Sequence, residues 1–201
     1  MSEAATTVFL VRHGAHDLLG RIVAGRMEGV ALNPEGRAQA ARAAARLARE
    51  RIGALYASPV QRARETAGPI AAALALPVGE APGLTELDYG SWTGRDLAGL
   101  DDDPRWSDWN HRRANTRIPD GESMAEVSAR GAQAIEGWRR SHPGEGVAAT
   151  THGDVIKAVV CGLIGLSFDR VHDFEVGPGS VTSLVVWQGG GKLLTLNEIP
   201  A

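Results

Sequence analysis

Two histidines in this chain each follow a short apolar run and precede a glycine. The run VFLV at 8–11 is rich in β-branched and aromatic residues, as in a strand covered on both faces, and RHG follows it at 12–14. The segment TTHGD at 150–154 repeats the arrangement before an apolar, helix-like stretch. Ligand crevices form at the carboxyl ends of parallel strands, so two such strands would present His13 and His152 at one edge. With arginines nearby, that edge suits a phosphate monoester.

A second cation and an acid are candidates for the same place. Arg62 lies near the start of the helix that Ser58 and Pro59 predict by their capping signal, and free N–H groups at such a start favour anions. Glu86 stands in the irregular stretch LTELDYGSWTG, where a carboxyl group could donate a proton. Taken singly, Arg62 is as well explained as a solvated helix arginine and Glu86 as a loop ion-pair partner. Together with Arg12, they favour phosphoryl chemistry.

The composition limits the other functions to consider. The 201 residues carry a formal net charge of -3, which gives no reason to expect a nucleic-acid or membrane partner. The single cysteine, Cys161, excludes an internal disulfide. The first residues lack a basic segment followed by an apolar one, and no run approaches the roughly 20 apolar residues of a membrane span. We expect a cytoplasmic protein.

The segments that must position these residues alternate between strand-like and helix-like patterns. Asn33 and Pro34 give an N-cap and a first-turn proline for one helix, and Ser123 with Glu126 makes a capping box for another over 124–141. The alternation predicts an α/β fold, a three-layer α/β/α sandwich with a mostly parallel central sheet. Further elements are predicted as strands at 54–58 and 147–151, a helix at 60–76 that Pro69 kinks or interrupts, and a closing antiparallel hairpin at 181–196.

The stretch from 77 to 121 has no regular pattern. We expect a single domain over 1–201, with a lid-like insertion at about 92–121, because a loop of this length is usually functional or mobile. The acidic run at 101–103 is predicted as a solvated turn. One group of insertion residues would either cover the site and select an anionic substrate, or pack as an amphipathic layer with a basic edge: Trp106, Trp109, His111, Arg112, Arg113 and Arg117.

In these motifs the chain resembles the histidine phosphatase superfamily, also called phosphoglycerate mutase-like. The blocks that carry the resemblance are LVRHG at 10–14, LNPEGRAQA at 32–40, ASPVQRARETA at 57–67, LTELDYGSWTG at 84–94, PDGESMAEVSAR at 119–130 and THGDVIKAVV at 151–160. The resemblance implies that His13 forms a phosphohistidine and that Glu86 donates a proton to the leaving group. The phosphoryl group would be bound by Arg12, Arg62, His152 and Gly153.

The chain departs from the family pattern just after its first motif. Many relatives have Glu or Gln after RHG and an Asn a few positions later, whereas this chain has Ala15 and, where that Asn would fall, Leu19. Arg21 and Arg26 are predicted as substrate-binding replacements, with a solvated loop arginine as the alternative for each. His16 would either line the mouth of the pocket or face water, and we favour water.

The favoured function is a metal-independent phosphomonoesterase without a cofactor, acting on a small phosphorylated metabolite and releasing inorganic phosphate. A cofactor-dependent phosphoglycerate mutase or related phosphomutase is the alternative. A non-catalytic phospho-ligand binding module is less consistent with Glu86. A metal site is a fourth hypothesis, with the ligands His13, His16, Asp17, His152 and Asp154. The terminal hairpin offers an edge for a homodimer.

Overall fold

A mixed sheet forms the centre of the protein. The computed structural model describes residues 5–201, which form six strands in the order β3-β2-β4-β1-β5-β6. The four strands β3, β2, β4 and β1 run parallel, whereas β5 and β6 are antiparallel to their neighbours, so the predicted mostly parallel sheet is confirmed. The bounds are β1 Thr6–Arg12, β2 Ile52–Ala57, β3 Val78–Glu80, β4 Gly146–Thr151, β5 Val181–Trp187 and β6 Gly190–Glu198.

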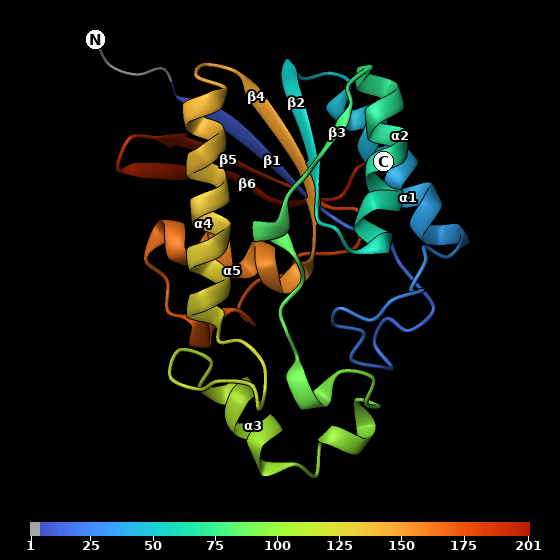
Figure 1. The fold of residues 1–201 in the computed structure, drawn as a ribbon, viewed down its shortest axis with the longest axis vertical. Coiled ribbons are helices and arrows are strands. Elements are labelled where there is room, and N and C mark those ends of the chain that lie inside the picture. Colours follow the sequence, from blue (N-terminus) through green and yellow to red (C-terminus); the bar gives the residue numbers. More distant parts are fainter. Residues whose placement is uncertain (1–4) are drawn as a thin grey trace.

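Helices cover both faces of this sheet (Figure 1). One face carries α1 (Pro34–Leu47) and α2 (Gln61–Leu74), and the other carries α4 (Met124–Ser141) and α5 (Gly153–Ile164). Alternate residues of β1 divide between the two cores, because Val8 and Leu10 pack toward α4 and α5 while Phe9 and Val11 pack toward α1 and α2. The three-layer prediction is therefore confirmed.

Two of the three predicted helix caps form. The Asn33 side chain accepts from the Gly36 N–H at 2.8 Å, and Ser123 and Glu126 make the reciprocal capping box at the start of α4. The prediction for Ser58 is wrong in detail, since α2 has Val60 at its N-cap with no side-chain cap and continues through Pro69 to Leu74. No helix among residues 5–201 combines the length and apolar character needed to cross a bilayer.

The irregular segment contains more structure than the sequence indicates. Beyond β3 it holds short 3-10 turns and a helix, α3 (Pro104–His111), which lies past the ends of the strands in Figure 1. Asp103 is the N-cap of α3 and accepts from the Arg105 N–H at 3.0 Å. The prediction of a solvated turn at 101–103 is therefore wrong for Asp103, which begins a helix with a proline at its first position.

The loop after β1 is held against the start of α1 by two glycines. A Cβ atom on Gly14 would lie 2.2 Å from the carbonyl oxygen of Gly36, and one on Gly36 would lie 2.0 Å from that of Ala15. Both positions therefore require glycine, because the two backbones touch. The contact fixes where the RHG segment leaves the sheet.

The last strand, β6, forms one edge of the sheet. Leu194 on this strand is 49% exposed, and Trp187 at the end of β5 is 43% exposed. An apolar edge of this kind is where strands of two chains can pair. Dimerisation through it stays a prediction.

Candidate active site

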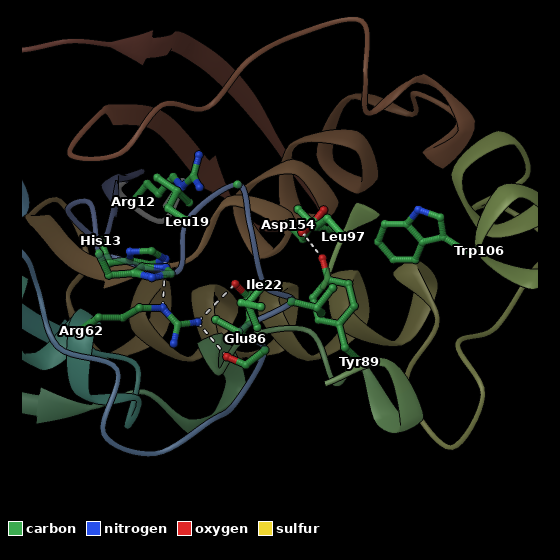
Figure 2. Close-up of a pocket in the computed structure, with 15 residues that line it drawn as sticks. Arg12, His13, Leu19, Ile22, Arg62, Glu86, Tyr89, Leu97, Trp106 and Asp154 are labelled. Atoms are coloured by element: carbon green, nitrogen blue, oxygen red, sulfur yellow. Dashed lines mark hydrogen bonds and ion pairs between the residues drawn. The ribbon is translucent and has the colours of Figure 1, made fainter. Parts of the chain in front are cut away.

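Side chains from three neighbouring strands meet at the carboxyl edge of the sheet, where Figure 2 shows Arg12 and His13 beside Arg62. His13 follows β1, His152 follows β4, and Ser58 follows β2, which pairs with β4. Arg12 and Thr151 are register partners, so the two histidines leave their strands side by side, with ring centroids 5.2 Å apart. The sequence prediction that both imidazoles share one edge is confirmed.

His13 is held as a neutral imidazole with one nitrogen free of a proton. Its Nδ1 lies 2.8 Å from the Gly14 carbonyl oxygen, and because a carbonyl can only accept, Nδ1 carries the proton. Its Nε2 accepts from the Arg62 Nε–H at 3.1 Å. Burial, followed by the positive charges of Arg62 and Arg12, lowers the pKa of His13 well below its usual value. Nε2 therefore carries a lone pair rather than a proton, and Arg62 holds that lone pair in a hydrogen bond.

The two arginines bring unpartnered donors to the same place. Arg62, from the first turn of α2, donates from Nη2 to the Gly25 carbonyl at 2.7 Å, while its buried Nη1 has no hydrogen-bond partner in the described residues. Arg12 donates from Nη1 to the Val176 carbonyl at 2.5 Å, and its Nε is likewise without a partner there. Buried cationic N–H groups without acceptors are suited to an oxyanion.

Gly153 contributes through its lack of a side chain. A Cβ atom at this position would lie 3.2 Å from Arg12 Nε, a tighter contact than side chains normally accept. The cavity beside His13 is not lined by Gly153 among the described residues. The structure therefore gives Gly153 the role of admitting Arg12 to the site.

His152 is completely buried and connects the strand ends. Its Nδ1 lies 3.3 Å from Arg62 Nη2, which can only donate, so the ring proton is on Nε2, 2.8 Å from Ser58 Oγ. Burial, with His13 as the next cause, lowers the pKa of His152 well below its usual value. Ser58 thus orients a site histidine, and the sequence treated it only as a cap.

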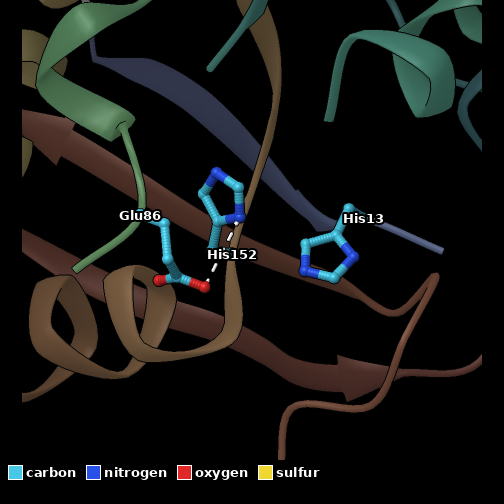
Figure 3. Close-up of side chains that lie close together, drawn as sticks. All are labelled: His13, Glu86 and His152. Atoms are coloured by element: carbon cyan, nitrogen blue, oxygen red, sulfur yellow. Dashed lines mark ion pairs between the residues drawn. The ribbon is translucent and has the colours of Figure 1, made fainter. Parts of the chain in front are cut away.

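Glu86 is a buried carboxyl group that can hold a proton at neutral pH. Burial, and then the nearby Asp154 carboxylate, raises the pKa of Glu86 to about 7, with Arg62 opposing the shift. Its Oε2 lies 3.5 Å from His152 Nδ1 (Figure 3) and 3.6 Å from Arg62 Nη2. A carboxyl group with such a pKa can serve as donor in one step and as acceptor in another.

The geometry does not suit a metal ion. His13, Glu86 and His152 place ligand atoms within 4.8 Å of one another (Figure 3). The Arg62 guanidinium, however, donates to the free lone pair of His13 and lies against Nδ1 of His152, so it holds the positions a cation would need. The predicted alternative set with Asp17 does not form in the described chain, where Asp17 is exposed.

The two loop arginines lie elsewhere. Arg26 donates from Nε to the Glu86 carbonyl at 2.8 Å, and its other nitrogens bind Asp88 and Glu122 at 3.2 Å and 2.9 Å. Arg21 is exposed, and neither arginine is among the described residues that line the cavity. The prediction that they bind substrate is thus not supported by their placement. Arg26 instead fixes the backbone of Glu86.

His16 lies in the site, whereas the sequence analysis favoured a side chain that faces water. It lines the cavity, is only 5% exposed, and has its ring centroid 5.4 Å from that of His13. Its Nδ1 is buried without a partner in residues 5–201, and burial lowers the pKa of His16 to about 4. The signal in the sequence was a third imidazole on the same loop, three residues after His13.

Beyond His13 the cavity is lined by residues from the loop after β1 and from the insertion. Tyr89 donates from its hydroxyl to Asp154 Oδ2 at 2.6 Å (Figure 2). Trp106 of α3 also lines the cavity, whereas Trp109 is completely buried beneath the Arg113 guanidinium. Sequence reasoning missed Tyr89, and considered Asp154 only as a metal ligand.

A comparison with known families shows which protein family this chain belongs to. A family model described as "Histidine phosphatase superfamily (branch 1)" matches residues 8–199. The chain belongs to the histidine phosphatase superfamily. The resemblance read from the motifs is confirmed, and this histidine phosphatase is an enzyme of the phosphatase class.

Several similar proteins are named as phosphatases. Phosphoserine phosphatase 1 of Hydrogenobacter thermophilus is 28% identical to this histidine phosphatase over 181 residues, which cover 86% of this chain and 84% of that protein. A metal-independent phosphoserine phosphatase of Arabidopsis thaliana is 37% identical over 166 residues, covering 79% and 69% of the two. The native structure of a mycobacterial glucosyl-3-phosphoglycerate phosphatase superposes with a TM-score of 0.87 at 25% identity, covering 96% and 99%.

Proposed function

We propose that this histidine phosphatase is a metal-independent phosphomonoesterase that hydrolyses a small phosphorylated metabolite through a phosphohistidine at His13. The observation that carries the proposal is the state of His13, whose Nδ1 proton is held by the Gly14 carbonyl while Nε2 carries no proton and accepts from the Arg62 Nε–H. Unpartnered guanidinium N–H groups of Arg62 and Arg12 stand ready for the phosphoryl oxygens.

In the first step, the Nε2 lone pair of His13 forms a bond to phosphorus and the bond from phosphorus to the ester oxygen breaks. The electrons of that bond stay on the leaving oxygen, which takes the proton of Glu86 and departs as an alcohol. The raised pKa of Glu86, about 7, keeps the donor form populated at neutral pH. The Nη1 group of Arg62 binds the charge that spreads over the phosphoryl oxygens.

In the second step, the Glu86 carboxylate removes a proton from water as the water oxygen bonds to phosphorus. The bond between phosphorus and Nε2 breaks, its electrons return to His13, and inorganic phosphate leaves. Glu86 is again protonated, so the cycle closes with one water consumed and no metal required. His152, fixed by Ser58, supports the same group from the neighbouring strand.

The names of the relatives support a small substrate. Similar proteins are named for phosphoserine and for glucosyl-3-phosphoglycerate, both of which are phosphate monoesters of small molecules. The cavity beside His13 measures about 150 Å³, in keeping with a compact organic group.

We also propose that residues 92–121 act as a lid. Leu97 and Trp106 from this segment line the cavity. The indole of Trp106 packs edge-on against the buried Trp92, with the ring centroids 5.2 Å apart. A segment placed over the reacting group can exclude water from the first step and admit it for the second.

The test is phosphate release from a panel of metabolite monoesters, with and without chelator. We expect release that survives chelation in the wild type, and loss of release in His13→Ala and Glu86→Gln. His111→Ala is the matched control, because His111 is an exposed histidine on α3. Alkaline quenching during turnover should trap a phosphate on the wild-type protein that is stable in alkali and released by acid, and none on His13→Ala.

Three results would contradict the proposal. Normal hydrolysis by His13→Ala would exclude the phosphohistidine. Isomerisation of a phosphoglycerate without phosphate release would identify a mutase that uses the same nucleophile. Binding of monoesters with no turnover of any would indicate a binding module instead.

A further inference from the structure

The cavity beyond His13, where the organic part of a monoester would lie, has an unusual balance of charge. Its apolar lining, which lies beside the polar groups around His13, consists of Leu19, Ile22, Val23, Ala24, Leu97 and Trp106. The polar groups at its far end are the Tyr89 hydroxyl and the Asp154 carboxylate, and Asp154 is the second residue of α5. These two determine what the organic part can carry.

Both polar groups offer lone pairs to the cavity. The Tyr89 proton is donated to Asp154 Oδ2 at 2.6 Å, so the phenolic oxygen is left as an acceptor. Burial, followed by the charge of Asp154, raises the pKa of Tyr89 well above its usual value, which keeps that proton in place. The carboxylate of Asp154 can only accept. A ligand there meets acceptors and must supply donors.

Asp154 is already paired with Arg113, and neither Arg113 nor the nearby Lys157 lines the cavity in the described residues. Arg113 donates from Nη1 to Asp154 Oδ1 at 2.9 Å and from Nη2 to Asn110 Oδ1 at 2.9 Å. Its guanidinium carbon lies 5.1 Å from the Trp109 ring centroid, and the residue is only 6% exposed. Because these contacts fix the plane of the guanidinium, Arg113 balances Asp154 rather than a ligand.

The remaining arginines of the insertion are also paired with carboxylates of the protein. Arg95 and Arg105 contact Asp103, Arg112 contacts Asp108, and Arg117 contacts Glu126. None of them lines the cavity in the described part of the chain. The cavity-lining arginines are Arg12 and Arg62, which flank His13 and are needed for the phosphoryl group.

Given the proposed function, we infer that the substrate is a phosphate monoester whose organic part carries hydroxyl or ammonium donors and no carboxylate, in contrast to the phosphoserine and glucosyl-3-phosphoglycerate for which similar proteins are named. A second anionic group would lie against Asp154 and the Tyr89 oxygen, and the described residues that line the cavity include no cation besides Arg12 and Arg62. A hydroxyl or ammonium group would instead donate to these two oxygens. The apolar walls suit the carbon chain between donor and phosphate.

The test compares monoesters of similar size that differ in charge. The substrates are glycerol 3-phosphate with hydroxyls, phosphoethanolamine with an ammonium group, and 3-phosphoglycerate with a carboxylate, with p-nitrophenyl phosphate as the common reference. We expect kcat/KM for the better of the first two to exceed that for 3-phosphoglycerate by about tenfold or more, because the unpaired carboxylate is buried beside a like charge.

A variant at Asp154 tests the cause of the preference. Asp154→Asn keeps the size of the side chain and frees Arg113 from its carboxylate, so the ratio of kcat/KM for glycerol 3-phosphate to that for 3-phosphoglycerate should fall by about tenfold or more. A ratio is used because loss of the Asp154 charge also affects Glu86 with every substrate. Asp108→Asn, which breaks the exposed ion pair with Arg112 on α3, should leave the ratio unchanged.

The outcomes separate this inference from the proposed function. Hydrolysis of 3-phosphoglycerate as fast as, or faster than, both other monoesters overturns the inference while leaving a phosphatase. An unchanged ratio in a folded Asp154→Asn, checked by circular dichroism, overturns the role of Asp154. If that variant does not fold, the wild-type ratio still decides the substrate class. No release from any compound, p-nitrophenyl phosphate included, overturns the proposed function and this inference with it.

Discussion

Arg62 Nε donates to His13 Nε2 at 3.1 Å, so the arginine that would bind the phosphoryl group also holds the lone pair of the nucleophile before substrate arrives. The same guanidinium reaches the Gly25 carbonyl and lies 3.6 Å from Glu86. One side chain thus contacts the nucleophile, the acid and the loop after β1. A bound phosphoryl group must draw the Nε–H away from His13 before Nε2 can attack.

Replacing Arg62 should therefore lower kcat/KM by more than the loss of one substrate contact would, because the same side chain also contacts His13 and Glu86. We expect Arg62→Met to lower kcat/KM for p-nitrophenyl phosphate by about 10²- to 10³-fold, the usual cost of losing a donor to developing charge. Arg62→Lys should recover little of the lost kcat/KM, since an ammonium group cannot place several N–H donors in the planar arrangement of a guanidinium. Arg64→Met, exposed on the same helix, serves as control. Retention of full activity by Arg62→Met would contradict this role.

The pH profile should report the proton on Glu86. Burial raises the pKa of Glu86 to about 7. The carboxyl group is therefore protonated and able to donate below that pH, and it is a carboxylate with no proton to donate above it. With an alkyl monoester, kcat/KM should fall as the pH rises through about 7. The fall should be weaker with p-nitrophenyl phosphate, whose leaving group needs no proton. The profile is measured by initial rates in wild type and Glu86→Gln.

Glu86→Gln carries the control for that profile. Without a titrating carboxyl group, the fall in kcat/KM near pH 7 should disappear, although the absolute rate with alkyl monoesters is low. A fall of the same size and midpoint in Glu86→Gln would assign the titration to another group.

His16 should contribute to binding the phosphoryl group. Its pKa of about 4 means that it is neutral at physiological pH, so it can supply an N–H or a lone pair but not a charge. We expect His16→Leu to raise KM for p-nitrophenyl phosphate by about tenfold, with a smaller change in kcat. A factor of that size corresponds to the free energy lost with one hydrogen bond to a charged group. His16→Asn should recover part of the loss. Asp17→Asn, its exposed neighbour, should change neither constant.

The opposite result at His16 is also informative. If His16→Leu binds vanadate and inorganic phosphate as tightly as the wild type, the imidazole only fills space beside His13. Loss of binding in both His16→Leu and Asp17→Asn would instead indicate a disturbed loop.

Glycines in two helices should respond oppositely to alanine. Gly36→Ala places a methyl group 2.0 Å from the Ala15 carbonyl oxygen, so the loop after β1 must shift, at a cost of about 1–3 kcal/mol in the free energy of unfolding. Gly137→Ala in α4 meets no described atom within 4 Å and should stabilise by about 0.5–1 kcal/mol. Urea denaturation measures both. Equal effects would contradict the close contact at Gly36.

Much of the fold and the centre of the site could be predicted from local patterns. Apolar runs at β1 and β4 are short, end in polar residues and precede helices, which is enough to place His13 and His152 on one edge. The caps at Asn33 and Ser123 act within one turn of chain, so the sequence contains the whole interaction.

Features that depend on contacts between distant segments could not be predicted this way. Arg26 was assigned to substrate, yet Asp88 and Glu122, more than sixty residues away, compete for its guanidinium. The burial of His16 depends on where the loop after β1 meets the rest of the protein. Helix α3 is a different case, because the Asp103 cap and the following proline were present in the sequence and were read as a turn.

β1 is bonded on both sides, by β4 and β5, and its side chains enter both cores. In hydrogen exchange, the amides leading into His13 should therefore open only with global unfolding, whereas the insertion, held through many exposed ion pairs, should exchange through small local openings. The proposed nucleophile His13 and the cavity-lining residues of the insertion, Leu97 and Trp106, thus belong to parts of the chain with different local stability. Sequence changes in the insertion can alter which ester is accepted while the phosphoryl chemistry stays as it is.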